Sequence, residues 1–201
     1  MVSIVYNKTF FLKSASNISD INIEYGVEIA FIGYSNSGKS SAINSLTNQK
    51  KLARFSKNPG RTQLINFFQV ISNFRIVDLP GYGYAKCPTL IQLKLEKLIY
   101  NYLKKRKPLK GLVMLMDIRH PLKVYDQCII NIAIDQNIPI FILLTKCDKL
   151  TLRQQKKQFE IVYTKLKVFL QEVHIELFSS FKKIGITQLQ SQLNVWYKQY
   201  K

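Results

Sequence analysis

The sequence predicts an α/β fold, a doubly wound and mostly parallel sheet of six strands with one antiparallel strand and helices on both faces. Short apolar runs alternate with stretches of helical period along most of the chain. One gap between neighbouring strand-like runs, at 71–73, has the length of a hairpin and accounts for the antiparallel strand. The length of 201 residues fits one domain. We expect an N-terminal arm at 1–22 and the main domain at 23–201.

The individual elements follow from local patterns. The expected strands lie at 27–33, 64–70, 74–78, 112–117, 139–144 and 173–178. The expected helices lie at 40–48, 90–103, 123–135, 151–170 and from Thr187 towards the end of the chain. Thr-x-x-Gln capping boxes at Thr151 and Thr187 are expected to begin the last two helices. The arm carries a candidate edge strand at 9–12, and the basic, turn-rich segment 49–63 is typical of a loop.

The charge of the chain is its most unusual bulk property, with a net value of +18. No acidic residue occurs between Glu28 and Asp78 or between Glu96 and Asp117, although both intervals are rich in lysine and arginine. Such a surplus favours a polyanionic partner, and nucleic acid in particular. The alternative is a compositional bias toward lysine, asparagine and isoleucine, which the whole chain shows. Contacts with phosphates would supply affinity without sequence specificity.

Composition also argues against several classes of protein. No apolar run approaches the ~18–20 residues that span a bilayer, so we expect no membrane association. Residues 1–13 lack the pattern of a secretory signal. Cys87, Cys128 and Cys147 have neither the spacing of metal ligands nor that of a disulfide framework. We therefore expect the reducing cytoplasm as the location of the protein.

The stretch Gly33-Tyr34-Ser35-Asn36-Ser37-Gly38-Lys39-Ser40 fits the pattern G-x-x-x-x-G-K-[ST] of phosphate-binding loops. It lies between an apolar run at 27–32 and a helical stretch at 41–46, which is the context that this motif requires. Glycines allow backbone N–H groups to point at a triphosphate, and the N-terminal end of the following helix adds positive potential. Lys39 would contact the β and γ phosphates, and the Ser40 hydroxyl would bind Mg²⁺.

Two further loops suit the same ligand. In Asp78-Leu79-Pro80-Gly81, which follows a predicted strand, Asp78 would hold Mg²⁺ through water and the Gly81 N–H would approach the γ-phosphate. In the basic segment Pro59-Gly60-Arg61-Thr62-Gln63, Thr62 would be a second Mg²⁺ ligand that engages only when a γ-phosphate is present. Taken alone, each stretch is also compatible with an ordinary turn.

The choice of base is indicated by Thr145-Lys146-Cys147-Asp148, which fits the guanine motif [NT]-K-x-D. The Asp148 carboxylate would accept hydrogen bonds from guanine N1–H and the 2-amino group, whereas adenine would leave that charge unpaired. The aliphatic part of Lys146 would lie over the base. In Phe178-Ser179-Ser180, backbone N–H groups would contact the guanine oxygen. An ATP-dependent enzyme on the same fold is the alternative, and Asp148 argues against it.

These loops, in this order, resemble those of the EngB family of bacterial ribosome-assembly GTPases, and the similarity extends from about Phe10 to the end of the chain. Two runs separate this family from other small GTPases. They are Pro80-Gly81-Tyr82-Gly83-Tyr84-Ala85 and Arg119-His120-Pro121-Leu122. Tyr34 replaces the arginine and Cys147 the alanine that are usual in the family, and neither change falls on a Mg²⁺ or phosphate role.

The resemblance implies the P-loop small GTPase (G domain) fold, GTP binding, and slow hydrolysis of GTP to GDP and phosphate. It implies a switch role in assembly of the large ribosomal subunit, with ribosomal RNA and the subunit precursor as partners, and a requirement in cell division and septation. We expect a monomer with Mg²⁺ as cofactor. The residues expected to contact GTP are Gly33, Tyr34, Ser35, Asn36, Ser37, Gly38, Lys39, Ser40, Gly60, Arg61, Thr62, Gln63, Leu64, Asp78, Leu79, Pro80, Gly81, Thr145, Lys146, Cys147, Asp148, Phe178, Ser179 and Ser180.

Tyr82 occupies the position directly after Gly81, where Ras-like enzymes carry a glutamine that orients the attacking water. We therefore expect slow turnover until an external group completes the site, either K⁺ beside Asn36 or the ribosomal particle. Asn36 could instead only shape the loop. The residues expected to act in hydrolysis are Lys39, Thr62 and Asn36. The missing glutamine also leaves open an RNA-binding scaffold that depends on nucleotide and has negligible hydrolysis.

Three side chains near these loops keep alternative interpretations. His120 follows a strand and could approach the switch loops in a catalytic role, but a structural role or a partner contact also fits it. Tyr82 and Tyr84 could stack on RNA bases or pack beneath the loop that begins at Gly81.

Overall fold

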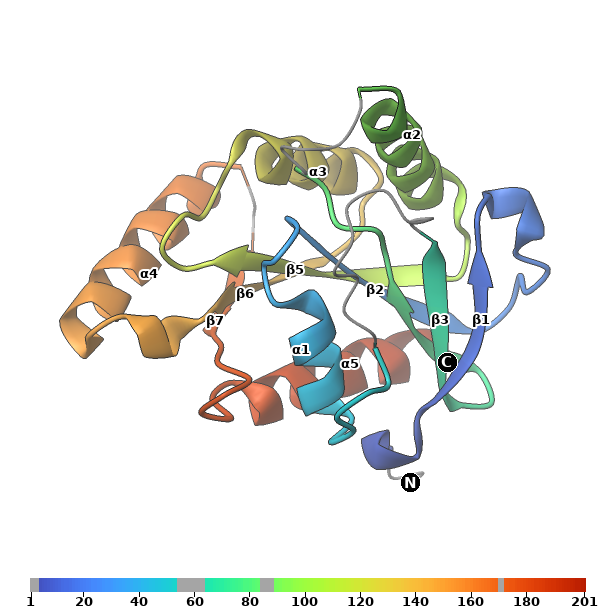
Figure 1. Ribbon diagram of the computed structural model, residues 1–201, viewed down its shortest axis with the longest axis horizontal. Helices are drawn as coiled ribbons and strands as arrows, with labels where there is room; N and C mark the ends of the chain where they lie inside the picture. Colours follow the sequence, from blue (N-terminus) through green and yellow to red (C-terminus); the bar gives the residue numbers. More distant parts are fainter. Residues whose placement is uncertain (1–3, 54–63, 84–88, 170–171) are drawn as a thin grey trace.

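The computed structural model of the chain describes residues 4–53, 64–83, 89–169 and 172–201. Its centre is a seven-stranded sheet in the order β1-β3-β4-β2-β5-β6-β7 (Figure 1). The strands are β1 (Phe10–Ala15), β2 (Val27–Gly33), β3 (Ile65–Ile71), β4 (Phe74–Asp78), β5 (Leu109–Asp117), β6 (Ile140–Thr145) and β7 (His174–Leu177). β3 runs antiparallel to both of its neighbours, and the other neighbouring pairs are parallel.

The predicted α/β fold with one antiparallel strand is confirmed, but the sheet has seven strands instead of six. The additional strand is β1, which lies in the N-terminal arm and pairs with β3 at the edge of the sheet. Phe10 and Phe11 at its start are 55% and 51% exposed. Because an edge strand that faces solvent lacks the long apolar run of a buried strand, the sequence marked this segment only as a candidate.

Helices cover both faces of the sheet. They are α1 (Lys39–Leu46), α2 (Thr89–Lys105), α3 (Val124–Asp135), α4 (Leu152–Lys167) and α5 (Ile186–Tyr200). α1 and α5 pack on one face, and α2, α3 and α4 pack on the other (Figure 1). Along the central strand β2, Ile29 and Phe31 belong to the core beneath α1 and α5. Ala30 and Ile32 belong to the core beneath α2, α3 and α4. Because both faces of β2 are buried, its sequence is an almost continuous apolar run.

The two expected capping boxes have different outcomes. At the start of α4, Thr151 Oγ1 accepts a hydrogen bond from the Gln154 N–H, and Gln154 Oε1 accepts one from the Thr151 N–H, as predicted. The box at Thr187 is wrong, since α5 begins at Ile186 with Gly185 as its N-cap. The left-handed conformation of Gly185, with φ +78°, turns the chain into the helix before Thr187 is reached. In the described ranges, no helix is both long and apolar enough to cross a bilayer.

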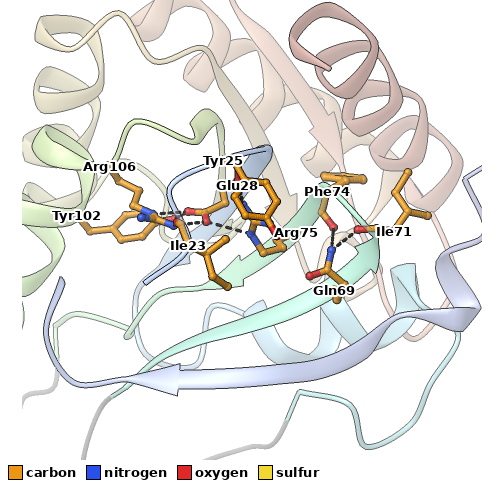
Figure 2. A network of polar contacts seen from close by, with 9 residues as sticks. All are labelled: Ile23, Tyr25, Glu28, Gln69, Ile71, Phe74, Arg75, Tyr102 and Arg106. Carbon is orange, nitrogen blue, oxygen red and sulfur yellow. Dashed lines mark hydrogen bonds and ion pairs between the residues drawn. The ribbon is translucent and has the colours of Figure 1, made fainter. Parts of the chain in front are cut away.

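Glu28, the one charge within the β2 run, lies fully buried near the start of the strand. Its carboxylate accepts hydrogen bonds from Arg75 Nε at 3.1 Å, Arg106 Nη2 at 2.6 Å and the Tyr102 hydroxyl at 2.8 Å (Figure 2). The two guanidinium groups also donate to the backbone carbonyls of Tyr25 and Ile23. Burial, together with the neighbouring Glu28 carboxylate, raises the pKa of Tyr102 well above its ordinary value. The network therefore fastens β2, β4 and the end of α2 together at the end of the sheet where β2 begins.

Candidate nucleotide-binding site

The phosphate-loop residues 33–40 connect the end of β2 to the start of α1. At Gly33, a Cβ would lie 2.4 Å from the Leu115 carbonyl oxygen and 2.6 Å from Ser37 Oγ, so no larger residue fits this close approach. Gly38 is the N-cap of α1, with φ +99° and no side-chain cap. The first N–H groups of α1 are therefore not capped by a side chain, which is the arrangement that binds phosphate in such loops.

Hydrogen bonds to neighbouring loops fix the shape of the phosphate loop. The Ser35 N–H donates to the Tyr82 carbonyl at 2.8 Å, and the Ser37 N–H donates to the Tyr34 carbonyl at 2.9 Å. Thr145 Oγ1 donates to the Ser37 carbonyl at 2.6 Å, which joins the guanine motif to the phosphate loop. The Ser37 hydroxyl is buried and has no hydrogen-bond partner within the described residues. A buried unpaired hydroxyl within this loop is consistent with a ligand oxygen nearby.

Lys39 and Asp78, which the sequence places at the phosphates and at Mg²⁺, form an ion pair with each other. Asp78 ends β4 and is only 5% exposed, and Lys39 is the first residue of α1. The Leu79 N–H donates to the Phe31 carbonyl at 3.0 Å, which holds the segment after Asp78 against β2. Ser40 follows Lys39 in the first turn of α1. The structure thus brings together three of the four side chains expected at the phosphates and Mg²⁺, and Thr62 lies outside the described residues.

On the base side, Lys146 is held over the phosphate loop by two contacts. Its ammonium group donates to the Asn36 carbonyl at 2.7 Å and lies 3.0 Å from Asp117 Oδ2. Arg119 donates two hydrogen bonds to the same carboxylate, from Nε to Oδ1 at 2.9 Å and from Nη2 to Oδ2 at 2.7 Å. Burial acts to raise the pKa of Asp117, but the hydrogen bonds from Arg119 and Lys146 outweigh it and hold that pKa well below its usual range. Asp117 therefore remains ionised and positions Lys146.

Asp148 is oriented by a hydrogen bond from the Ser179 hydroxyl to Oδ1, at 2.6 Å. This hydrogen bond lowers the pKa of Asp148, so the carboxylate is ionised at neutral pH and suited to accept from guanine. Cys147, between the two motif side chains, is fully buried in the core, and burial raises the pKa of its thiol. The Cys147 N–H donates to the Phe178 carbonyl at 3.2 Å. These contacts bring the loops at 145–148 and 178–180 together, as the sequence predicted.

Tyr82 points into the protein and is only 4% exposed. Its hydroxyl donates to Asp126 Oδ1 at 2.7 Å, and its ring centroid lies 4.8 Å from that of Tyr34. Burial, with a further contribution from Asp126, raises the pKa of Tyr82 well above its ordinary value. Of the two interpretations left open for Tyr82, packing beneath the loop is the one that the structure supports. Tyr84 lies outside the described residues.

The remaining expected site residues either lie outside the described residues or make few contacts within them. The segment from Gly60 to Gln63 lies outside the described residues, and Leu64 is half-buried directly before β3. Asn36 is exposed in the left-handed region, with φ 64°, where asparagine is more readily accommodated than most residues. His120 is exposed, and its ring makes no hydrogen bond within the described part of the chain.

Asp117 and Asp126 were not among the expected site residues, although both support them. Asp117 ends a predicted buried strand and begins the run that continues into Arg119-His120-Pro121-Leu122, and these sequence signals could have indicated that it belongs to the site. Asp126 carried no signal, because its contact with Tyr82 joins residues 44 positions apart in the sequence.

The loops at 33–40, 78–81, 145–148 and 178–180 follow β2, β4, β6 and β7 on a mostly parallel sheet, and together they define a P-loop GTPase domain. A family model described as "50S ribosome-binding GTPase" matches residues 28–146. The chain is 70% identical to the probable GTP-binding protein EngB of Buchnera aphidicola from Schizaphis graminum, over 100% of both chains. It is 50% identical to the probable EngB of Haemophilus influenzae, over 98% of this chain and 96% of the relative. The chain belongs to the EngB family of GTP-binding proteins.

Solved structures agree on the fold. A crystal structure of a probable GTP-binding protein EngB superposes with a TM-score of 0.71 at 23% identity, covering 86% of this chain and 100% of the other. Era in complex with MgGDPNP and nucleotides 1506–1542 of 16S ribosomal RNA has a TM-score of 0.64 at 18% identity, covering 87% of this chain and 57% of the other. At these identities the similarity shows a shared fold.

Proposed function

We propose that this GTPase is a slow switch in assembly of the large ribosomal subunit. In its GTP form it binds ribosomal RNA of the subunit precursor, and hydrolysis releases it. The protein acts in the cytoplasm as a monomer, and through subunit assembly it is required for normal cell division and septation. The family description as a ribosome-binding GTPase and the net charge of +18 support this partner.

The observation that carries the proposal is the location of Tyr82. Its hydroxyl is held by Asp126 at 2.7 Å and its ring is buried, so this side chain does not face a γ-phosphate bound beside Gly81. No group at this position can then orient the attacking water as a glutamine would. A slow intrinsic rate suits a switch whose GTP state must persist until its partner accelerates hydrolysis.

The residues present fit Mg²⁺. The Asp78 carboxylate and the Ser40 hydroxyl are hard oxygen donors, which Mg²⁺ prefers. No three His, Cys, Asp or Glu side chains gather within the described ranges, so phosphate oxygens of the nucleotide would complete the coordination. GTPases of this fold generally use Mg²⁺, which neutralises charge that develops on the phosphates. Ser40 would hold the ion directly and Asp78 through water, with Thr62 as the further ligand in the GTP state.

Two activators are proposed for the slow step. One is the ribosomal particle, and the other is K⁺ bound beside Asn36, which is exposed at the rim of the phosphate loop. Replacing Na⁺ by K⁺ in a turnover assay separates them. K⁺ activation predicts a rate increase that Asn36→Ala abolishes, whereas an unchanged rate removes K⁺ and leaves the particle.

The proposal is tested by measuring phosphate release from GTP with and without large-subunit precursors. A slow switch predicts measurable release from the protein alone and faster release with the particle. A scaffold that only binds nucleotide predicts no release in either case, and that result would replace the proposed function. Lys39→Ala serves as the control that removes hydrolysis by the protein itself, because Lys39 would contact the phosphates.

A further inference from the structure

A basic hollow lies at the end of the sheet opposite the nucleotide loops. Its volume is about 320 Å³, and it is formed where α2 leads into β5, where α3 leads into β6, and at the end of α5. The residues that line it include four lysines and a tyrosine, Lys104, Lys105, Lys107, Lys110 and Tyr200. No aspartate or glutamate lines it. The hollow therefore concentrates positive charge in a concave surface, where the field of several lysines acts on one ligand.

None of these four lysines forms an ion pair within the described residues. Arg106 also lines the hollow, but its guanidinium group is held by Glu28 and is not available to a partner (Figure 2). Lys104 and Lys105 lie in the last turn of α2 and complement the negative end of the helix. That role does not extend to Lys107 and Lys110, which follow the helix. Like charges that line one hollow repel one another, and a bound anion would reduce that repulsion.

Aromatic rings stand beside two of the lysines, Tyr200 within the lining of the hollow and Tyr100 outside that lining on α2. The Lys110 ammonium lies 5.6 Å from the centre of the Tyr200 ring, and the Lys104 ammonium lies 5.4 Å from that of Tyr100. Both rings are partly exposed, at 39% and 43%. Lysines for phosphates and tyrosine faces for bases are the combination with which proteins bind unpaired nucleic acid. Exposed Gln136 and Asn137 add amide groups that can contact a ribose 2′-hydroxyl.

We propose that the basic hollow binds the backbone of ribosomal RNA, as a second contact that does not depend on which nucleotide is bound. This inference rests on the proposed function, since it assigns a surface to the RNA partner. Lys110 and Asp117 are seven residues apart along β5, which places the hollow roughly 23 Å from the guanine end of that strand. RNA in the hollow and GTP at the loops therefore do not compete for space. The hollow contributes an affinity for RNA that is the same in both nucleotide states. The nucleotide loops contribute the affinity for RNA that changes when GTP binds.

The test compares two variants that lose the same charge. One carries Lys104→Gln, Lys105→Gln, Lys107→Gln and Lys110→Gln in the hollow. The other carries Lys156→Gln, Lys157→Gln, Lys165→Gln and Lys167→Gln on α4, where all four lysines are exposed. Binding to transcribed bacterial large-subunit ribosomal RNA is measured by filter retention across a salt series, in GDP and in a GTP analogue. Affinity for a fluorescent GDP confirms that each variant is folded.

The hollow variant is expected to lose affinity for RNA by about tenfold or more, and its salt slope is expected to fall by up to about 3. The affinity for RNA should fall by the same factor with GDP and with the GTP analogue. The α4 variant should bind RNA about as tightly as the unmodified protein. Tyr200→Ala should lose about fivefold, with Tyr163→Ala on α4 as its control. Equal losses in the two charge variants would overturn the inference, because they would show general attraction by net charge.

Other outcomes separate this inference from the proposed function. If the unmodified protein binds RNA and the hollow variant binds equally well, the inference alone fails. If the hollow variant keeps RNA binding but loses binding to polyglutamate, the surface takes an acidic polypeptide, which also overturns it. If the unmodified protein binds no RNA in either nucleotide state, the proposed function itself fails.

Discussion

The two ends of the sheet use positive charge in different ways. At the carboxyl ends of the strands, Lys39 is paired with Asp78 and Lys146 with Asp117, so each cation is held by a carboxylate. At the opposite end, the buried Arg106 is paired with Glu28, but the lysines of the basic hollow are unpaired within the described residues.

Paired and unpaired cations on one basic chain suit two different kinds of ligand. A cation fixed by a carboxylate has a defined position, which suits a small nucleotide whose phosphates and base must be placed accurately. Free lysines on long side chains tolerate variation, which suits an RNA backbone. Net charge alone does not distinguish these uses, whereas the pairing of each cation does.

The largest expected effect concerns the nucleotide end. Asp148→Asn should weaken GTP binding by about 10⁴-fold, because a donor amide then faces two donors of guanine. The same variant should gain affinity for xanthosine triphosphate, whose carbonyl at position 2 can accept from the new amide. Direct titrations with fluorescent GTP and with fluorescent xanthosine triphosphate measure the two affinities. If the variant retains GTP affinity within tenfold, or if ATP displaces GDP from the unmodified protein, Asp148 does not select guanine.

The next effect concerns the buried network at the other end. Glu28→Gln leaves Arg75 and Arg106 buried without their carboxylate, and we expect it to lower the free energy of unfolding by about 3–5 kcal/mol in urea titrations. Glu160→Gln, an exposed change on α4, should alter it by less than about 0.5 kcal/mol. Folded Glu28→Gln protein should still bind GDP. A loss below about 1 kcal/mol would mean that the network does not fasten this end of the sheet.

A matched pair of glycine substitutions separates an effect on stability from an effect on nucleotide binding. At Gly111, near the start of β5, a Cβ would lie 2.3 Å from the Trp196 ring, and Gly111→Ala should cost about 1–3 kcal/mol of stability without changing GDP affinity. Gly33→Ala pushes against the backbone carbonyl of Leu115 and should weaken GDP binding as well. Urea unfolding and GDP titration are measured on both. If Gly111→Ala impairs GDP binding as strongly as Gly33→Ala, the close approach at Gly33 has no particular role in nucleotide binding.

The smallest expected effect is a dependence of stability on pH. Because the folded-state pKa of Asp117 is lowered, its contribution to stability is present above the unfolded-state pKa of about 3.9 and is lost as pH falls through the folded pKa. The advantage of the unmodified protein over Asp117→Asn should therefore shrink on acidification below about pH 4, by at most ~1.4 kcal/mol per pH unit and less where solvent screens the exposed Arg119.

Asp135→Asn, at an exposed position ending α3, is the control for this measurement. Any pH dependence of its stability relative to the unmodified protein is subtracted as the effect of losing one exposed carboxylate. A constant difference for Asp117→Asn after that subtraction would show that Asp117 is not held ionised by Lys146 and Arg119.

The sequence predicted much of the fold because buried parallel strands and amphipathic helices leave strong periodic patterns. β2 was predicted at its observed bounds, since both of its faces are buried. β1 was harder to predict, because its pairing with β3 at a sheet edge depends on residues at least fifty positions away in the sequence. The start of α5 was missed because the left-handed Gly185, rather than a capping side chain, sets it.

The nucleotide site was predictable to the extent that its chemistry lies in short motifs. Lys39, Asp78, Lys146 and Asp148 could each be named from a loop that follows a strand. Their supports could not, because the contacts of Asp117 with Lys146 and of Asp126 with Tyr82 join separate segments. The basic hollow was also predictable only in part. Its lysines lie in an interval of the sequence without acidic residues, but Tyr200, which lies beside them, comes from the other end of the chain.

The proposed switch requires GTP to control binding of this protein to the large-subunit precursor. Co-sedimentation with precursor particles at fixed salt, in the presence of a GTP analogue, GDP or no nucleotide, tests it most directly. We expect the highest affinity with the GTP analogue and a lower residual affinity with GDP that the basic hollow maintains. Equal affinity in all three states would contradict a switch, and absence of binding in all three would contradict the ribosomal partner.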